Sequence, residues 1–166
     1  GGEILTNQKV TQLNYENGAV RGAVTETQEL RAKQTVLATE IGAAKKLIAQ
    51  SSIKHECFKN LLELPAVPAV TIQFELNQPT MPYDRTTFGA GTSLASFTEQ
   101  SRTTFTHVPG RLSCILAPAQ KFINMNSEDI LNIVLEDAKK LGLQLEGHIL
   151  DYRVVKHPDE FYSLEP

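Results

Sequence analysis

The chain has 166 residues and a formal net charge of -3, from 16 lysines and arginines against 19 aspartates and glutamates. Hydrophobic residues make up 41% and charged residues 21%, which excludes a disordered chain, and no apolar run approaches the roughly 20 residues that span a bilayer. The charges are scattered rather than clustered, so we expect no nucleic-acid partner. Because no run spans a bilayer and the two cysteines are expected to be reduced, we expect a protein that is cytoplasmic or peripheral to a membrane.

The first part of the chain predicts a small antiparallel β-meander. Apolar and polar residues alternate over residues 9–15 and again over 20–25, and Asn17-Gly18 between them is a strong signal for a type I′ hairpin turn. A short third strand is expected over residues 29–32.

The segment of residues 34–50 predicts a short buried strand that turns directly into a helix. Residues 35–38 are β-branched or apolar, and the Thr39 hydroxyl could cap the helix that follows. The helix would bury one apolar stripe, formed by Ile41, Ala44, Leu47 and Ile48.

A second helix is expected over residues 55–62, ended by Pro65 and Pro68 because proline lacks the amide that a helix needs. The next strand, residues 69–76, alternates so that one face is buried. That face comprises Val70, Ile72, Phe74 and Leu76.

The remainder predicts further strands packed against one long helix. The strand candidates are residues 86–88, 94–97, 103–108, 111–117 and 148–155. Residues 126–141 have a capping residue at Asn126 or Ser127, acidic residues in the first turn, and Gly142 after the last. The predicted class is therefore α+β, an antiparallel β-meander joined to a mixed-sheet lobe with packed helices.

The residues give little support for catalysis or metal binding by this chain alone. The run 89–94 lacks the third glycine of a phosphate-binding loop, and a loop between strands is expected there. His55 and Cys57 have no second pair to complete a zinc site, and Cys114 with His107 lacks an orienting third group. We expect no metal site, two buried reduced thiols, and no identifiable catalytic residue.

Two acidic pairs lie on the long helix. Dipole complementation explains Glu128 and Asp129, and a contact between Glu136 and Lys140 would explain the second pair. Glu136 and Asp137 are therefore expected on a solvated face.

Short motifs follow one another over nearly the whole chain. They are Gly2-Glu3-Ile4, residues 7–10, Thr35-Val36-Leu37-Ala38-Thr39, Ile115-Leu116-Ala117-Pro118-Ala119, and Tyr152-Arg153-Val154-Val155-Lys156-His157-Pro158 leading to Phe161-Tyr162-Ser163-Leu164-Glu165-Pro166. In this order they resemble the FAD-dependent amine oxidase superfamily, especially its phytoene and carotene desaturase branch.

The resemblance implies an internal fragment of a flavoprotein, with residues 1–40 a β-meander strip of the FAD-binding domain and 41–166 the substrate-binding lobe. It implies that Val10 touches the FAD adenine through its backbone and that the Ala38-Thr39 turn passes near the cofactor, although Glu40 stands where the family has glycine. The family's glycine-rich unit and Gly-Asp motif would lie outside this chain. We therefore expect FAD in the full-length protein and not in the fragment, which is expected to be inactive alone.

The implied chemistry is hydride removal from an apolar polyene or isoprenoid by FAD. The implied partners are that substrate, the remainder of the parent chain and a membrane surface in peripheral contact. Phe74, Phe88 and Phe97 could line an apolar tunnel or could be core residues. Two alternatives stay open: a self-contained, non-catalytic carrier of a small apolar ligand, and a structural lobe that self-associates.

Overall fold

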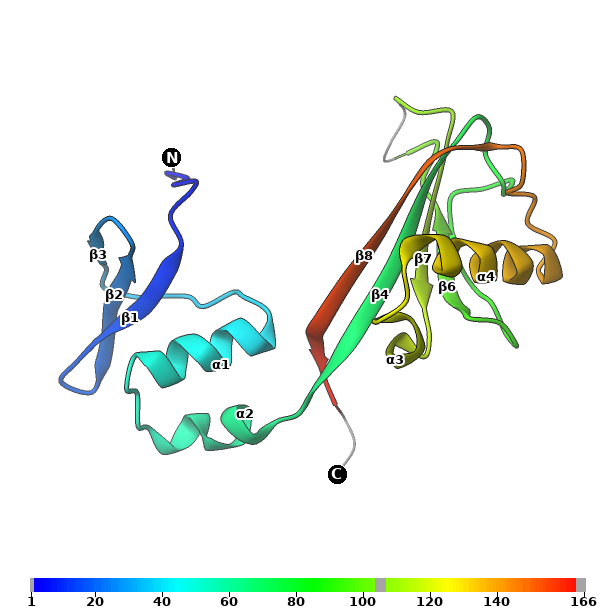
Figure 1. Ribbon diagram of the computed structural model, residues 1–166. Coiled ribbons are helices and arrows are strands. Elements are labelled where there is room, and N and C mark those ends of the chain that lie inside the picture. Colours follow the sequence, from blue (N-terminus) through cyan, green and yellow to red (C-terminus); the bar gives the residue numbers. More distant parts are fainter. Residues whose placement is uncertain (1, 104–106, 164–166) are drawn as a thin grey trace. The chain divides into compact units, whose positions relative to one another are not determined.

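The computed structural model describes residues 2–103 and 107–163 (Figure 1). By packing, the chain forms two compact units, Gly1–Val67 with Asp159–Pro166 (unit 1) and Pro68–Pro158 (unit 2). Each unit has a hydrophobic core of its own. Helices and antiparallel strands alternate irregularly along the chain, which confirms the α+β class.

Unit 1 opens with the predicted meander. Its strands are β1 (Val10–Glu16), β2 (Ala19–Thr25) and β3 (Glu29–Arg31), paired antiparallel in that order. Asn17 and Gly18 join β1 to β2 with φ angles of 51° and 79°, the left-handed backbone that a type I′ turn needs at both central positions. The hairpin prediction is confirmed.

Three helical segments follow the meander, α1 (Ile41–Gln50), the 3-10 turn η1 (Glu56–Phe58) and α2 (Lys59–Glu63). Ile48 of α1 packs against Leu13 and Ile53 in the core of unit 1, as its predicted apolar stripe requires. The Ser51 hydroxyl accepts a hydrogen bond from the Leu13 amide at 2.7 Å and donates to the Leu47 carbonyl at 2.5 Å. These contacts hold α1 against β1.

The predicted buried strand over residues 35–38 is wrong. This stretch is irregular and exposed, and Val36 is 88% exposed. No backbone hydrogen bond holds it within the part of the chain that the structure describes, so its β-branched residues have no neighbouring strand to pair with. Glu40 rather than Thr39 caps α1, because its carboxylate accepts from the amides of Gly42 at 2.6 Å and Ala43 at 2.7 Å.

Unit 2 is built on a five-stranded sheet in the order β5-β6-β7-β4-β8. The strands are β4 (Ala66–Leu76), β5 (Thr86–Phe88), β6 (Leu94–Glu99), β7 (Gly110–Leu116) and β8 (Ile149–Tyr162). The Asn77 amide donates to the His148 carbonyl at 2.9 Å and the Ser163 amide to the Pro65 carbonyl at 2.8 Å, so β8 runs antiparallel to β4. The boundary between the two units falls within both of these strands.

The sheet is antiparallel in its described pairs, although a mixed sheet was expected. A strand, a long helix and another strand in sequence often form a parallel pair. Here β7 and β8 do run in the same direction, but β4 lies between them and pairs antiparallel with each.

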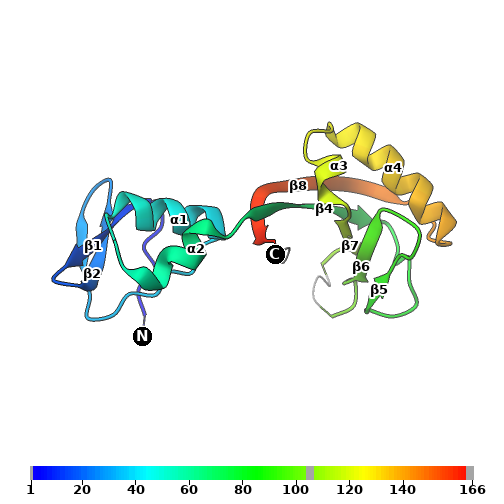
Figure 2. The same ribbon diagram turned by 90° about the horizontal axis from the view of Figure 1, so that it is seen from below.

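Two helices, α3 (Ala119–Phe122) and α4 (Ser127–Lys140), cover one face of this sheet (Figure 2). Of the two predicted capping residues, Asn126 caps α4, because its side chain accepts from the Asp129 amide at 2.8 Å. Gly142 follows the helix with a φ of 76°. The predicted apolar face of β4 is buried under the helices. The main contacts of the core are among Val70, Ile72, Phe74, Leu76, Leu112, Leu116, Phe122, Ile130 and Val134.

Several predicted boundaries differ from the structure. β8 extends to Tyr162 instead of ending at residue 155, and β4 begins at Ala66 and contains Pro68. Pro68 precedes Val70, where the ladder with β7 begins, so it removes no amide from that ladder. Of the predicted strand over residues 103–108, residues 103, 107 and 108 are turn or bend, and residues 104–106 lie outside the described residues.

The two cysteines occupy different environments. Cys114 is buried in the core of unit 2, where desolvation raises the pKa of its thiol to about 12, whereas Cys57 is exposed. The expectation of two buried thiols is therefore right for Cys114 and wrong for Cys57. An uncharged thiol in the core is a poor nucleophile, which argues against the Cys114–His107 pair as a catalytic dyad.

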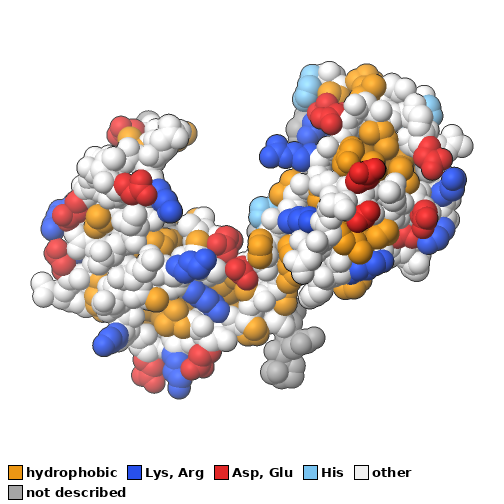
Figure 3. Space-filling model, in the orientation of Figure 1, with side chains coloured by type: hydrophobic (Ala, Val, Ile, Leu, Met, Phe, Trp, Pro, Cys, Tyr) orange, Lys and Arg blue, Asp and Glu red, His pale blue; other side chains and the backbone are white. Residues whose placement is uncertain are grey.

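Charged side chains of both signs are interspersed over each unit on the face that Figure 3 draws. None of the helices that the structure describes combines the length and the hydropathy needed to cross a bilayer. The assignment of residues 1–40 and 41–166 to two functional domains stays a prediction.

Candidate functional site

The face of the five-stranded sheet opposite α3 and α4 carries a different set of side chains. Because successive strand residues point to opposite faces, the residues between the core positions lie here. We call this surface the open face. Its residues are Thr71, Gln73 and Glu75 on β4, Arg111, Ser113 and Ile115 on β7, and Thr86, Phe88, Ser96, Thr98, Asp151 and Arg153 on the other strands.

The pairing registers arrange these side chains in rows across the strands. One row contains Phe88, Ser96, Ile115 and Thr71. The next row contains Thr86, Thr98, Ser113 and Gln73, and the one after it contains Arg111 and Glu75. Phe88 is 79% exposed and Ile115 is 47% exposed. The two exposed apolar side chains of the open face therefore lie at one end of the strands, beside hydroxyl-bearing residues, and the charged side chains lie at the other end.

The charged end of the open face contains a cavity of about 220 Å³. Its lining consists of Gln73, Glu75, Arg111, Asp151, Tyr152 and Arg153. The Arg111 guanidinium donates to the Glu75 carboxylate at 2.9 Å and to the Gln73 side-chain oxygen at 3.2 Å, which fixes its position. Arg153 makes no ion pair within the described chain.

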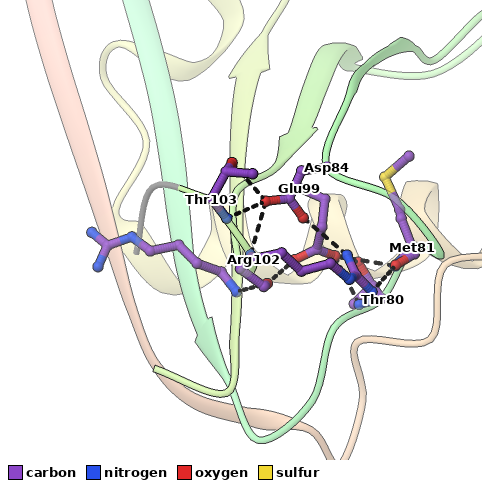
Figure 4. Close-up of polar contacts among 8 residues, drawn as sticks. Thr80, Met81, Asp84, Glu99, Arg102 and Thr103 are labelled. Atoms are coloured by element: carbon purple, nitrogen blue, oxygen red, sulfur yellow. Dashed lines mark hydrogen bonds and ion pairs between the residues drawn. The ribbon is translucent and has the colours of Figure 1, made fainter. Parts of the chain in front are cut away.

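A buried carboxyl group holds the loop before β5 to the end of β6 (Figure 4). Glu99 is 1% exposed, and one of its oxygens accepts from the Thr80 amide at 2.8 Å, the Thr80 hydroxyl at 3.0 Å and the Met81 amide at 3.1 Å. Its other oxygen accepts from the Ser101 hydroxyl. Because the loop leads into β5, this network sets where Phe88 sits at the edge of the open face.

Asp84 closes the same loop from its other end (Figure 4). Its carboxylate accepts from the Arg102 guanidinium at 2.9 Å and from the backbone amides of Arg102 at 2.8 Å and Thr103 at 2.9 Å. Desolvation raises the pKa of Asp84, but these hydrogen bonds outweigh it and the net pKa is below the ordinary value. The ion pair is therefore present at neutral pH.

Asp137 lies at the back of the β5–β6 loop and was wrongly expected on a solvated face. It is buried and accepts from the Ser93 amide at 2.8 Å and from the Lys140 ammonium at 2.7 Å, whereas Glu136 is exposed. The Ser93 amide needs an acceptor at this position, and the helix supplies one. Desolvation raises the pKa of Asp137, but Lys140 and Ser93 outweigh it and leave the net pKa lowered.

We expect Asp137→Asn to lower the free energy of unfolding by about 1 to 2 kcal/mol at pH 7, because the Ser93 amide and Lys140 lose a charged acceptor. A lowered folded-state pKa means that the contribution of Asp137 is complete above its ordinary pKa of 3.8 and is lost as the pH falls further. Urea unfolding of wild type and variant at pH 7 and at pH 3 measures the loss of unfolding free energy at each pH. The difference between wild type and variant should shrink at pH 3, while Glu136→Gln should have little effect at either pH; an unchanged difference contradicts the assignment.

The aromatic residues proposed for a tunnel are divided between the two faces. Phe74 and Phe97 are buried under the helices and are core residues, and Phe88 alone of the three lies on the open face. The polar residues of the open face were missed from the sequence. The alternation of Thr71, Gln73 and Glu75 with the core positions of one strand could have indicated them. The same pattern is also typical of an ordinary solvated strand face.

The residues expected near the cofactor all lie in unit 1. Val10 begins β1 opposite Thr25, and Ala38 and Thr39 lie in the exposed stretch before α1. Within the described residues no hydrogen bond joins Val10 to Ala38 or Thr39. Their roles stay predictions. The described residues also contain no group of three or more His, Cys, Asp and Glu side chains that could hold a metal ion.

A family model described as flavin containing amine oxidoreductase matches residues 1–164. The chain belongs to this family. The family is flavin-containing, so the resemblance inferred from the short motifs is confirmed at the level of the superfamily.

Curated relatives of the chain include two enzymes named 15-cis-phytoene desaturase, chloroplastic/chromoplastic. The proteins from an Oncidium hybrid cultivar and from Arabidopsis thaliana are each 25% identical over 178 residues, which covers 100% of this chain and 31% of the relative. This amine oxidoreductase chain therefore spans less than a third of the length of the curated relatives it matches.

Solved structures of low identity share the fold. An oxidoreductase from Methanosarcina mazei has a TM-score of 0.66 at 18% identity, over 93% of this chain and 37% of that one. A putative protoporphyrinogen oxidase from Exiguobacterium sp. 255-15 has a TM-score of 0.61 at 17% identity, over 94% and 35%. A reduced UDP-galactopyranose mutase has a TM-score of 0.65 at 7% identity, over 91% and 34%.

Proposed function

We propose that this chain is the substrate-binding part, with a strip of the cofactor domain, of a flavin-dependent oxidoreductase that removes a hydride from an apolar polyene or isoprenoid. Alignment of the whole chain with two phytoene desaturases supports this substrate class. The structural observation that carries the proposal is the open face, a sheet surface that no described helix covers and that exposes the apolar side chains of Phe88 and Ile115.

We expect a dinucleotide site to need residues beyond the described part of this chain. A pyrophosphate binds readily at the N-terminus of a helix, but the N-terminus of α1 is occupied by the Glu40 carboxylate. We therefore assign most of the flavin contacts to the remainder of the full-length protein, with Val10, Ala38 and Thr39 as additional contacts. When bound there, the flavin would accept the hydride.

The work of this chain is to bind and orient the substrate. Phe88 and Ile115 offer exposed apolar surface to a hydrocarbon, and the small side chains of Ser96 and Ser113 leave room above the strands. The hydrogen bonds of Glu99 and Asp84 hold the loop before β5, so the Phe88 edge is fixed before the substrate arrives.

The visible spectrum of the purified full-length protein tests the proposal. Flavin absorption bands that persist through gel filtration are the expected result. The isolated 166-residue chain, mixed with FAD and passed through the same column, should emerge without them. A full-length protein that is folded and colourless, and that gains no bands on reconstitution with FAD, would refute the flavin assignment.

The alternative of a non-catalytic carrier rests on the same open face, since unit 2 has its own core beneath that face. A carrier would bind an apolar ligand saturably and carry no flavin.

As partners we propose the apolar substrate and the remainder of the parent chain. We also propose peripheral contact with a membrane surface, which would supply a water-insoluble substrate. We propose no nucleic-acid partner.

A further inference from the structure

The open face is graded in polarity along its strands. On β7 the outward residues run from Ile115 through Ser113 to Arg111, and at 3.3 Å per residue the two ends are roughly 13 Å apart. The exposed Ile115 lies at one end of this line, with Phe88 two strands further across on β5, and the cavity with Gln73 and Glu75 lies at the other end. A ligand that spans this distance would contact the apolar side chain of Ile115 at one end and the polar side chains of the cavity at the other.

The polar cavity carries charges that cancel. Two arginines, Arg111 and Arg153, face two carboxylates, Glu75 and Asp151. Arg111 and Glu75 are already paired at 2.9 Å, and Gln73 accepts from Arg111. A carboxylate or an ammonium group in the ligand would find no net opposite charge here. A hydroxyl or carbonyl group finds guanidinium donors and carboxylate acceptors within one cavity.

We infer that the substrate is a polyene or isoprenoid with one neutral oxygenated end, a hydroxyl or a carbonyl, seated in the Gln73–Arg153 cavity while its hydrocarbon body lies over Ile115 and Phe88. This inference rests on the proposed function for the hydrocarbon body, and it adds the polar end to it. A bare hydrocarbon would offer no hydrogen-bonding group to the Arg153 and Asp151 side chains of this cavity.

The test compares ligands that share one polyene chromophore. Binding of all-trans-retinol, its hydrocarbon analogue axerophtene and all-trans-retinoic acid to the full-length protein is measured by equilibrium dialysis in dilute nonionic detergent. Retinol is expected to bind about tenfold more tightly than axerophtene, the gain of one hydrogen bond to a charged group, and more tightly than retinoic acid. Equal or tighter binding of axerophtene, or no binding of any of them to folded protein, overturns the inference. Tighter binding of retinoic acid overturns the neutral end.

Variants locate the two ends of the ligand. Arg153→Gln and Gln73→Leu should each reduce the preference for retinol, while Phe88→Ala should weaken retinol and axerophtene equally. Arg21→Gln, an exposed arginine of β2, and Phe161→Ala, an exposed aromatic of unit 1, are the matched controls and should leave binding unchanged. A preference that survives both cavity substitutions places the polar end elsewhere and refutes the assignment.

The outcome separates this inference from the proposed function. Flavin bands in the full-length protein without a preference for retinol leave the oxidoreductase proposal standing and overturn the oxygenated end. A preference for retinol in a protein that cannot bind flavin supports the oxygenated end and overturns the oxidoreductase proposal.

Discussion

Replacing Phe74 with alanine is expected to lower the free energy of unfolding of unit 2 by about 4 kcal/mol. Phe74 lies on β4, between β7 and β8 in the sheet, and it is 0% exposed. Its ring packs in the core with residues of α3 and α4, including Phe122 and Val134. Truncation removes that burial and leaves a cavity, because β4 is hydrogen-bonded to β7 on one side and to β8 on the other and cannot move to fill it.

Urea unfolding followed by circular dichroism measures this loss. Thr71→Ala is the matched control, since Thr71 is on the same strand and points to the open face; a change of less than about 0.5 kcal/mol is expected there. Comparable losses in the two variants would contradict the assignment of the two faces.

Glu99→Ala is expected to cost about 3 kcal/mol of unfolding free energy. The substitution leaves the buried amides of Thr80 and Met81 without their acceptor, and each unsatisfied group costs about 1 to 3 kcal/mol. The loop before β5 should then loosen. Faster hydrogen exchange at the amides of Thr80 and Met81 would report it directly.

Glu99→Gln distinguishes the lost hydrogen bonds from a general disturbance of the core. The amide oxygen of glutamine can still accept from Thr80 and Met81, and its amino group can donate to the Ser101 hydroxyl. Recovery of more than half of the lost stability is expected, with Glu136→Ala on the exposed side of α4 as the neutral control. Equal losses for Gln and Ala would mean that the loop depends on the negative charge and not on the acceptor.

Local chemistry accounts for the parts of the fold that the sequence predicted well. Three features depend only on residues close together in the sequence: the Asn17-Gly18 turn, the Asn126 helix cap, and the alternating strand with one buried face. The buried residues of that strand are Val70, Ile72, Phe74 and Leu76. Tertiary packing agrees with each of these preferences, so the strands and helices form where the pattern indicated.

The features that escaped prediction depend on partners distant in sequence. Glu99 accepts a hydrogen bond from the Thr80 amide, and Asp137 accepts one from the Ser93 amide. The periodicity of the sequence does not reveal these contacts. The open face was missed for a related reason, because a polar strand face can be a binding surface or ordinary solvated surface. The roles of Val10, Ala38 and Thr39 came from resemblance alone, and nothing in the packing of unit 1 singles them out.

The bare stretch over residues 35–39 has a consequence for handling the protein. Thr35 to Thr39 is uncharged, free of proline and glycine, and rich in β-formers, and its amides and carbonyls make no backbone hydrogen bond to any other described residue. Such runs recruit copies of themselves edge to edge into fibrils or precipitate. We therefore expect these five residues to promote aggregation of concentrated samples, and a lysine in place of the exposed Val36 should slow it.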